Sequence, residues 1–500
     1  MALSAQAAID RAKELLSFGA MPRERGPVEP KAMPPETAQQ VALNLLMGAK
    51  AYEEPRLARI SAALKPNKRH DELGIEIPDD APEKMKRLAE KAQANFLPLI
   101  VDAFSQVMTV TDYIASDTKK TSAAWQYWTR NQMNARQTGL HRSTLKYGAS
   151  YLVCLPGNNG PVMKGVSPLH MTAVYQDPVN DQWPMFALQT DRRLIYLYDE
   201  VAEYILGMEN MPTSSFGFPN WQNVSDITFI ESRAHGAGVC PVVRYRDSML
   251  LEGEEQYGII EPLLSIQNRI NETNFGMLVT QFFSAFRQRY AMGWWPESEQ
   301  EALRATASDL WLFKDPNVEV GQFDETDPKF YVAGKDDAVQ DLSSIAQVPA
   351  TQLGVSQIAN ISAEALTALE EGKTRKVDEI TTSLGESHEQ ALRLCCHLDG
   401  DEAGASDFEA RVRWKDATAR ALAATVDALG KMGQMLGVPD ELLWEDIPGW
   451  DHSKVARAKE IRTNADPLEA LYLQAAQGAP AVARGIQAEE AVDPSGQPGQ

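Results

Sequence analysis

The most restrictive feature of this sequence is a long segment that can form one unbroken helix. It runs from residue 362 to residue 398 and contains no proline. About 37 residues at ~1.5 Å each give a rod of roughly 55 Å, which is long enough to cross an entire domain. Ser362 is a suitable N-cap, and Glu364 in the first turn complements the helix dipole. Any fold of this chain has to accommodate that rod.

The segment directly before this helix has the opposite character. Residues 348–360 read VPATQLGVSQIAN and carry no charge. The rest of the chain is strongly acidic, with a formal net charge of −21 at pH 7. Such acidity excludes a protein that grips nucleic acid over its whole surface, because that needs clustered cations. The neutral segment is either an ordinary surface loop or a loop that has to avoid adhering to a partner.

The remaining pattern predicts an α+β fold that is mainly α. Residues 1–147 show helical periodicity, and the last of these helices ends at Gly148. Residues 148–252 contain short runs rich in Val, Ile, Tyr and Phe, which predict antiparallel β structure. These runs are ASYLVCL, MFALQTD, RLIYLYD, DITFIES and CPVVRYRD.

A second helical region follows at residues 253–283, and it has two stripes. One stripe is apolar, as expected for a face packed on a core. The neighbouring stripe is polar but uncharged, and it consists of Gln267, Asn271, Asn274 and Gln281. An ordinary solvated face is one interpretation of this second stripe, although exposed faces usually carry Lys and Glu.

Residues 284–334 form a compact insertion between two helices, the second of which is predicted at 335–347. The insertion concentrates aromatic and basic residues, which suit either a small local core or a contact with a partner. These residues are Trp294, Trp295, Trp311, Arg287 and Arg289. After the long helix, residues 399–475 predict a small helical domain, and residues 476–500 have the composition of a disordered tail.

No motif predicts catalysis, a cofactor or a metal. The triplet at Gly372–Thr374 resembles a phosphate-binding loop, but Thr367 stands where the motif needs a glycine, and the triplet lies inside a helix. Cys395 and Cys396 are adjacent on a helix and point about 100° apart, so they do not easily share a zinc ion with His388. We expect buried thiols beside a solvated His388 instead, and no enzymatic activity.

The chain shows no export or membrane signal. Its first twenty residues lack a cationic region followed by an apolar core, so we expect no signal peptide. No window reaches about 18 consecutive apolar residues, so no membrane-spanning helix is expected. The four cysteines, Cys154, Cys240, Cys395 and Cys396, predict free buried thiols in a reducing compartment.

Three motifs in this order resemble the portal proteins of long-tailed double-stranded DNA bacteriophages. They are YGIIEPLLSIQNRINET, which resembles the start of a stem helix; ISAEALTALEEGKTRKV, which resembles the start of the long helix after the channel loop; and GVPDELLWEDIPG, which resembles part of the C-terminal crown. The resemblance covers roughly residues 30 to 470. It implies a subunit of a ring of about twelve copies around a central channel.

The resemblance also implies a division of the chain into named regions. These are a wing at 1–252 (helical at 1–147, antiparallel β at 148–252), a first stem helix at 253–283, a clip at 284–334, a second stem helix at 335–347, a channel loop at 348–361, a long wing-to-crown helix at 362–398, a helical crown at 399–475 and a disordered tail at 476–500. The ring would stand at the capsid vertex of the virion, after synthesis in the host cytoplasm. Its partners would be non-specifically bound double-stranded DNA, the terminase packaging motor, a head-tail adaptor, and the major capsid and scaffold proteins.

Particular residues acquire roles from this resemblance. The channel loop would offer neutral hydrogen-bonding groups to sliding DNA, because cationic contacts would build an affinity that grows with every phosphate. These groups are Gln352, Ser356, Gln357 and Asn360. The polar stripe from Gln267 to Gln281 would face the channel, and the tryptophans and arginines of the insertion would contact a partner. Another capsid, connector or scaffold subunit is the alternative function, and an enzyme of unknown chemistry is a third.

Overall fold

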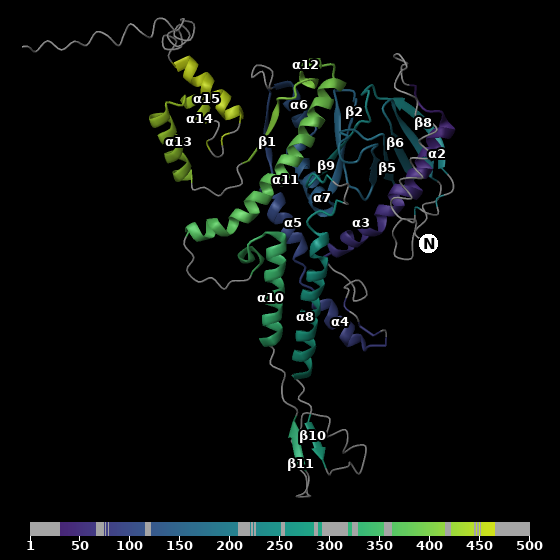
Figure 1. The fold of residues 1–500 in the computed structure, drawn as a ribbon, viewed down its shortest axis with the longest axis vertical. Helices are drawn as coiled ribbons and strands as arrows, with labels where there is room; N and C mark the ends of the chain where they lie inside the picture. Colours follow the sequence, from purple (N-terminus) through teal and green to yellow (C-terminus); the bar gives the residue numbers. More distant parts are fainter. Residues whose placement is uncertain are drawn as a thin grey trace, which may run out of the picture. The chain divides into compact units, whose positions relative to one another are not determined.

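The structure is a computed structural model with two compact units, Met1–Ala417 and Thr418–Gln500. Figure 1 shows the elements of each unit. The structure describes residues 31–66, 75, 77–78, 80–115, 122–208, 221, 224, 227–251, 256–284, 289–292, 319–322, 329–354, 363–415, 422–444, 447, 450 and 452–465.

The first unit begins with helices that cover a sheet. Helix α2 (Pro35–Leu45) starts with proline, which suits a first turn whose N–H groups have no helical partner. It continues through a π turn (Leu46–Lys50) into α3 (Ala51–Ala63). Alanine and leucine side chains of α2 and the π turn pack on the sheet with Leu188, Leu197 and Tyr204. These helices therefore close one face of the five-stranded sheet (Figure 1).

Two antiparallel sheets form the β part of this unit. The five-stranded sheet has the order β4-β5-β6-β7-β8, and the three-stranded sheet has the order β3-β2-β9. The strands are β2 (Ala149–Leu155), β3 (Val162–Val166), β4 (Met171–Val174), β5 (Phe186–Asp191), β6 (Leu194–Tyr198), β7 (Ala202–Met208), β8 (Ile227–Ala234) and β9 (Val242–Arg246). Five of them coincide with the predicted runs, and β3, β4 and β7 were not predicted. The two sheets share a small core that includes Val153, Tyr198 and Val242.

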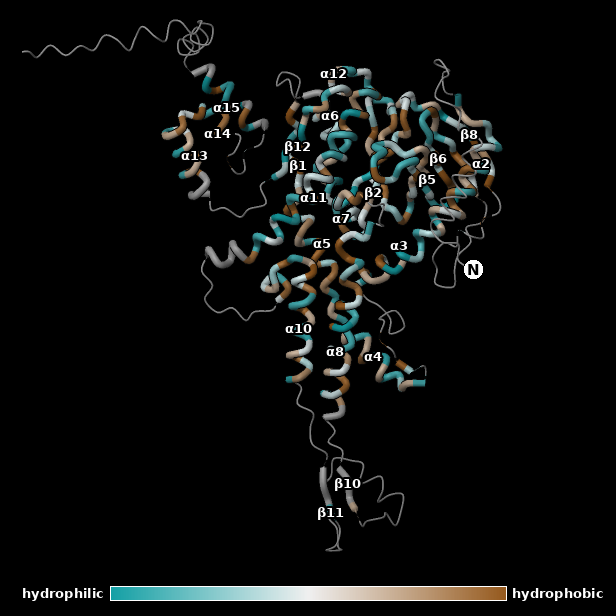
Figure 2. Tube along the Cα trace, in the orientation of Figure 1, coloured by the Kyte–Doolittle hydropathy of each residue, from teal (hydrophilic) through white to brown (hydrophobic). Residues whose placement is uncertain are grey.

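The main core lies where helices α5 (Leu97–Ser105), α6 (Ser122–Arg130), α7 (Met133–Tyr147) and α11 (Ala363–Leu398) meet. Helix α4 (Glu83–Lys91) lies outside this core. Helix α7 ends at Gly148, which has φ +85°, as the sequence predicts. Figure 2 shows hydrophobic segments gathered around α5 and α7, and the buried residues of this core run from Leu57 to Ala410.

Helices α8 (Leu264–Ser284) and α10 (Lys329–Ala346) lie side by side (Figure 1). A Cβ atom on Gly276 would lie 2.8 Å from the ring of Tyr331, so glycine permits this close approach. The bounds differ from those predicted. Helix α8 starts after a 3-10 turn (Glu261–Leu263) that contains Pro262. Helix α10 starts six residues before the predicted residue 335, because the aromatic residues of its first turn already belong to the helix.

Two short strand pairs complete the first unit. Strand β1 (Val110–Ile114) pairs antiparallel with β12 (Arg411–Trp414), and β10 (Arg289–Met292) pairs with β11 (Glu319–Gln322). The first pair joins segments 302 residues apart, between Thr111 and Arg413. With helix α12 (Glu402–Ala405), strand β12 belongs to the first unit, so the second unit begins at residue 418 and not at the expected 399.

The second unit is small and helical. It contains α13 (Leu422–Leu436), α14 (Asp440–Leu443) and α15 (His452–Ala465). Its described apolar side chains are mostly exposed, with Met435 at 79% and Leu436 at 72%, while Leu443 and Val455 are buried. Arg462 lies 3.5 Å from Asp440 and stacks over Trp444, which ties α15 to α14. This unit therefore leaves much of its apolar surface to be covered from outside.

Candidate functional site

The first half of the predicted channel loop is packed against the core. We call residues 348–354 the loop anchor; it contains a 3-10 turn (Ala350–Leu353). Val348 and Leu353 are buried at 1% and 4% exposure. The Ser343 hydroxyl donates to the Val348 carbonyl at 2.6 Å, which closes the end of α10. The other predicted loop residues, Ser356, Gln357 and Asn360, lie outside the described residues.

Gln352 joins the loop anchor to the long helix. Its Nε2 donates to Glu370 Oε1 at 3.3 Å, and Lys373 Nζ donates to its Oε1 at 3.4 Å. Burial lowers the pKa of Lys373, and the nearby Glu370 carboxylate acts against that shift. Gln352 is therefore a half-buried link to α11, and its amide is already engaged by two side chains of that helix. Contact between Gln352 and DNA stays a prediction.

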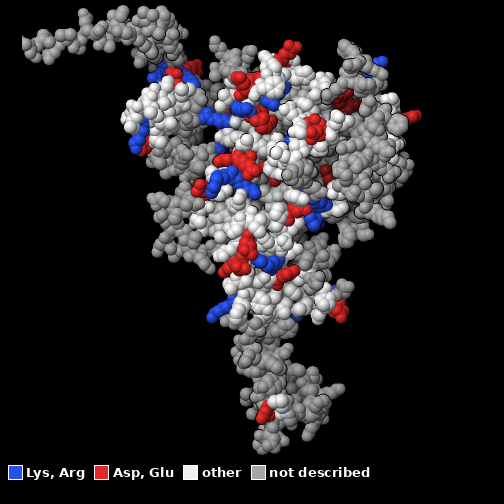
Figure 3. Space-filling view, viewed as in Figure 1, with Lys and Arg blue, Asp and Glu red and all other residues white. Residues whose placement is uncertain are grey.

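A pocket of about 290 Å³ lies beside the loop anchor. Its lining combines apolar side chains with one carboxylate and one ammonium group, and consists of Leu99, Asp102, Ala103, Gln106, Val107, Val348, Gln352, Leu353 and Lys373. Asp102 also pairs with Arg142 at 2.7 Å. The base of the loop is therefore close to neutral, and it presents no collar of cations among the described residues. Figure 3 likewise shows acidic and basic side chains interspersed on the visible face of the first unit.

The polar stripe of α8 has a different role from the one predicted. Gln267, Asn271 and Asn274 are buried, at 2%, 3% and 7% exposure. Their amides bond to the backbone that links α4 to α5. Gln267 Oε1 accepts from the Phe96 N–H at 2.9 Å and its Nε2 donates to the Ala94 carbonyl at 2.8 Å.

Asn271 and Asn274 extend this set of bonds along α8. Asn271 Oδ1 accepts from the Ala94 N–H at 3.2 Å, and Asn274 Nδ2 donates to the Ala92 carbonyl at 3.1 Å. Buried backbone groups need such partners, and uncharged amides supply both donor and acceptor without burying a charge. These three residues therefore do not face a channel. Gln281, at the far end of α8, is exposed.

The insertion between α8 and α10 is described only at its paired strands. Arg289 is the first residue of β10. The other residues that we expected to contact a partner lie outside the described residues: Trp294, Trp295, Trp311 and Arg287.

The segment directly before α8, residues 256–261, contacts α3 and α7, and the sequence did not predict these contacts. Arg56 of α3 donates to the Gln256 carbonyl at 2.6 Å and lies 3.1 Å from Glu261 Oε2. Gly258, with φ +69°, lets the chain pass so close to α7 that the Ile259 N–H bonds to the Leu145 carbonyl at 2.9 Å. Arg56 and Glu261 are 205 residues apart, so no local pattern indicates their pairing.

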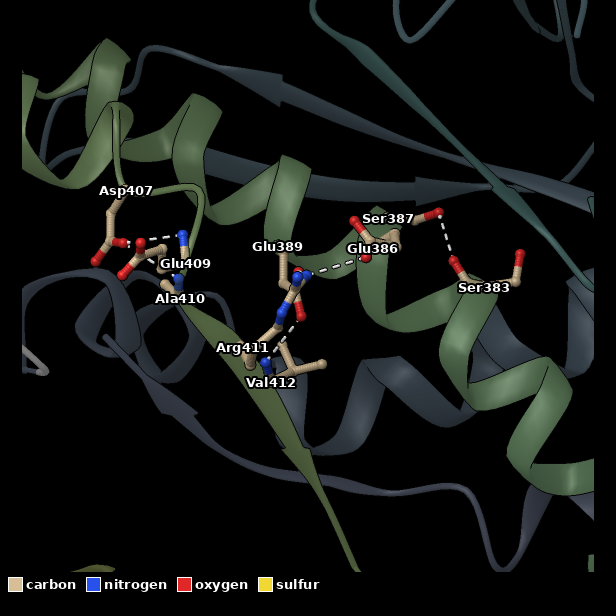
Figure 4. Close-up of polar contacts among 9 residues, drawn as sticks. All are labelled: Ser383, Glu386, Ser387, Glu389, Asp407, Glu409, Ala410, Arg411 and Val412. Atoms are coloured by element: carbon tan, nitrogen blue, oxygen red, sulfur yellow. Dashed lines mark hydrogen bonds and ion pairs between the residues drawn. The ribbon is translucent and has the colours of Figure 1, made fainter. Parts of the chain in front are cut away.

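The second half of α11 is held on two sides, and Figure 4 shows the contacts with β12. On one side, the Ser383 and Ser387 hydroxyls donate to the carbonyls of Arg246 and Arg244 in β9, at 2.8 and 3.1 Å. On the other side, Glu389 accepts from the Val412 N–H of β12 at 3.1 Å (Figure 4). Burial raises the pKa of Glu389, and its hydrogen bonds to β12 act against that shift.

Arg411 completes the contact between α11 and β12. Its guanidinium lies 2.9 Å from Glu389 and 3.0 Å from Glu386 (Figure 4). Neighbouring hydrogen bonds from Glu409 and Ala410 to Asp407 fix the turn into β12. The long helix is thus attached to the three-stranded sheet through β9 and to the β1–β12 pair through β12.

His388 is fully buried, which corrects the prediction of a solvated histidine. It lies in the main core between His141 of α7 and Tyr245 of β9, whose side chains bond to it at 2.8 and 3.0 Å. Its spacing from Leu384 and Ala391, in steps of four and three, follows the apolar stripe of α11. That spacing was the signal for burial. Desolvation lowers the pKa of both imidazoles, to about 4 for His141.

The four cysteines are free and buried, as predicted. Burial raises the pKa of Cys240, and contact with Cys154 together with burial raises that of Cys395, so these thiols are poor nucleophiles. Among the described residues, no group of three or more His, Cys, Asp or Glu is placed to hold a metal ion. Within the same residues, no helix is long and apolar enough to cross a membrane.

Comparison with known proteins identifies the family. Portal proteins of Mycobacterium phages L5 and D29 are 20% and 22% identical to this chain, over 394 and 446 residues. The aligned parts cover 73% of this chain and 76% of the L5 protein, and 84% of this chain and 87% of the D29 protein.

Two solved structures to which this chain shows a likeness come from gene transfer agent (GTA) particles. The neck of an empty GTA particle computed with C6 symmetry and the virion of a native GTA particle each give a TM-score of 0.41 at 15% identity. The likeness covers 73% of this chain and 92% and 96% of those chains. The family described as "Phage portal protein, SPP1 Gp6-like" matches residues 53–468. Because this match spans well over half of the sequence, the chain belongs to the phage portal protein family.

Proposed function

We propose that this chain is the repeating subunit of a portal ring at one vertex of a phage capsid. Double-stranded DNA would pass through the ring during packaging and ejection, and the ring would dock the terminase motor and the head-tail adaptor. The family match over residues 53–468 carries this proposal. A connector or scaffold subunit is the alternative, but the match favours the portal role.

The structure suggests how the chain could serve as a conduit. Helices α8 and α10 lie side by side with the insertion between them, which fits a two-helix stem that carries a clip. Helix α11 starts beyond the loop anchor and is attached to β9 and β12 in its second half. We therefore assign the stem to α8 and α10, the clip to the insertion, the wing to the elements that precede α8, and the wing-to-crown connection to α11.

Ring assembly is the first expected result. Several large apolar side chains on described helices are exposed, among them Phe330 at 76% and Met435 at 79%, and neighbouring subunits would cover such surfaces. A 55.3 kDa subunit in a ring of about twelve gives particles of roughly 660 kDa. Mass photometry at micromolar concentration should show them. A protein that stays monomeric there would contradict the ring.

The neutral part of the loop is the second subject for a test. We propose that residues 355–361 face DNA and that the loop anchor positions them. Gln357→Lys would add one cation per subunit, and a ring of such cations should retain DNA at low salt and release it as salt rises. Gln357→Asp should retain none.

The readout for these loop variants is the length of packaged DNA per particle across a salt series. Gln434→Lys, which adds the same charge to an exposed position of α13, is the matched control and should package like the parent. If Gln357→Lys and Gln434→Lys behave alike, the loop does not face DNA.

A further inference from the structure

A chain of hydrogen bonds crosses the main core and joins three elements. His141 Nδ1 of α7 lies 3.2 Å from the Met108 carbonyl, and His141 Nε2 lies 2.8 Å from His388 Nε2 of α11. His388 Nδ1 lies 3.0 Å from the Tyr245 hydroxyl of β9. The side chains of His141, His388 and Tyr245 have no exposed surface. We call these three residues and the Met108 carbonyl the histidine chain.

The bonding capacities of these atoms fix the direction of every bond. A carbonyl only accepts, so His141 Nδ1 carries a hydrogen and donates to Met108. Neutral His141 then accepts at Nε2, which requires His388 to donate from its own Nε2. His388 consequently accepts at Nδ1 from the Tyr245 hydroxyl. In this arrangement both imidazoles are neutral and each ring nitrogen has one partner.

The surroundings of the histidine chain supply no counter-charge. Trp128 of α6 and Trp414 of β12 pack uncharged rings on His388, with centroids 5.0 and 5.9 Å away. Among the described residues, the titratable groups that face the two imidazoles are the imidazoles themselves and Tyr245; beyond Tyr245 lie the thiols of Cys154 and Cys395. Burial raises the pKa of Tyr245 and contributes to the raised pKa of Cys395, so neither becomes an anion at neutral pH. A proton added here stays a buried, unpaired charge.

We propose that the histidine chain is a proton-operated latch that holds α11 against α7 and β9 while both imidazoles are neutral and releases α11 when they take up protons. A first proton from solvent can bind at His388 Nδ1 if the Tyr245 hydroxyl turns from donor to acceptor. A second proton has only His141 Nε2 to bind, where an N–H would then point at the N–H of His388. That arrangement breaks the 2.8 Å bond.

The sign of the pH dependence follows from the two states. Each imidazole has a lower pKa in the closed latch than in the open one, where it approaches its ordinary value of about 6.5. The open state therefore binds more protons, so the closed state is fully favoured above about pH 6.5 and loses stability as pH falls below it. Between pH 7.5 and 5.5, one such imidazole increases the opening equilibrium about tenfold, and two increase it about a hundredfold.

Hydrogen–deuterium exchange of the full chain measures this opening. The exchange rates of α11 amides around residues 377–396 are divided by their intrinsic rates at each pH, which leaves the opening equilibrium. We expect it to rise about a hundredfold from pH 7.5 to pH 5.5. Amides of α8, which has no histidine, are the internal control and should change little. Equal corrected rates for α11 at both pH values would overturn the proposal.

Histidine variants separate the latch from a merely structural contact. His141→Gln should reduce the pH response of α11 to about tenfold, and His141→Gln with His388→Gln should abolish it. His397→Gln is the matched control, because His397 is an exposed residue of the same helix. It should keep the full response. A double variant that keeps the parental pH response of α11 would overturn the proposal. If that variant does not fold, the comparison of exchange in α11 and α8 of the parent protein decides.

Discussion

Replacing Gly258 by alanine should strongly destabilise the first unit. Gly258 has φ +69°, and a Cβ there would lie 2.6 Å from the Gly148 nitrogen and 2.8 Å from the Leu145 carbonyl oxygen. Both atoms are backbone, so no side chain can move aside. The C-terminal end of α7 would have to move away from the segment before α8. The hydrogen bond from the Ile259 N–H to the Leu145 carbonyl would then be lost. We expect a loss of about 3 kcal/mol or more in the free energy of unfolding.

Gly236→Ala is the matched control for this substitution. Gly236 has a nearly identical φ of +67°, but nothing lies within 4 Å of its Cβ position. Gly236→Ala should therefore lower the free energy of unfolding only by the backbone strain, about 1 kcal/mol. Urea unfolding followed by circular dichroism would measure both variants. Equal losses would show that the close approach at Gly258 does not matter to the fold.

Gln267→Leu is expected to be nearly as damaging, although leucine is similar in size and apolar. The substitution leaves the Phe96 N–H and the Ala94 carbonyl without the partners that they have at 2.9 and 2.8 Å. Each partly buried backbone group that loses its partner costs about 1–3 kcal/mol, so the two groups together give an expected loss of roughly 2–6 kcal/mol in the free energy of unfolding. Thermal unfolding should show it as a lower midpoint.

Gln281→Leu on the same helix is the control, since Gln281 is exposed. It should change the free energy of unfolding by less than about 0.5 kcal/mol. A channel-lining role for both glutamines predicts the opposite outcome: little effect of either variant on stability, and a shared effect on DNA passage. Stability data from the two variants therefore choose between these two roles for Gln267.

The type of each long element could be predicted from the sequence, and so could several bounds. Helix α11 starts at Ala363, next to the predicted N-cap Ser362, because proline-free periodicity is a strong signal over that length. Strands β2 and β9 were found because their sequences, ASYLVCL and VVRYR, are rich in valine, leucine and tyrosine. Strand β3 was missed because its sequence, VMKGV, contains a lysine and a glycine, and β12 because it is only four residues long.

The candidate site was predicted less well, for a physical reason. Periodicity shows that Gln267, Asn271 and Asn274 share a face of α8, but not what that face contacts. The backbone groups around Ala94 that bond to these three amides are 171 to 182 residues away in the sequence. His388 presents the same difficulty, because its partners His141 and Tyr245 come from other elements. Neutral amides and imidazoles suit a buried backbone or a water-filled channel equally well.

The pairing of β1 with β12 has a consequence for synthesis on the ribosome. Thr111 emerges 302 residues before Arg413, its hydrogen-bonding partner. At about 5–20 residues per second, translation leaves β1 without its neighbour for roughly 15–60 s. During that time α11, which supplies His388 and Leu384 to the core, is also missing or incomplete. The nascent first unit therefore exposes an open strand edge and apolar surface for much of its synthesis, which makes it a natural client for chaperones that bind chains before release.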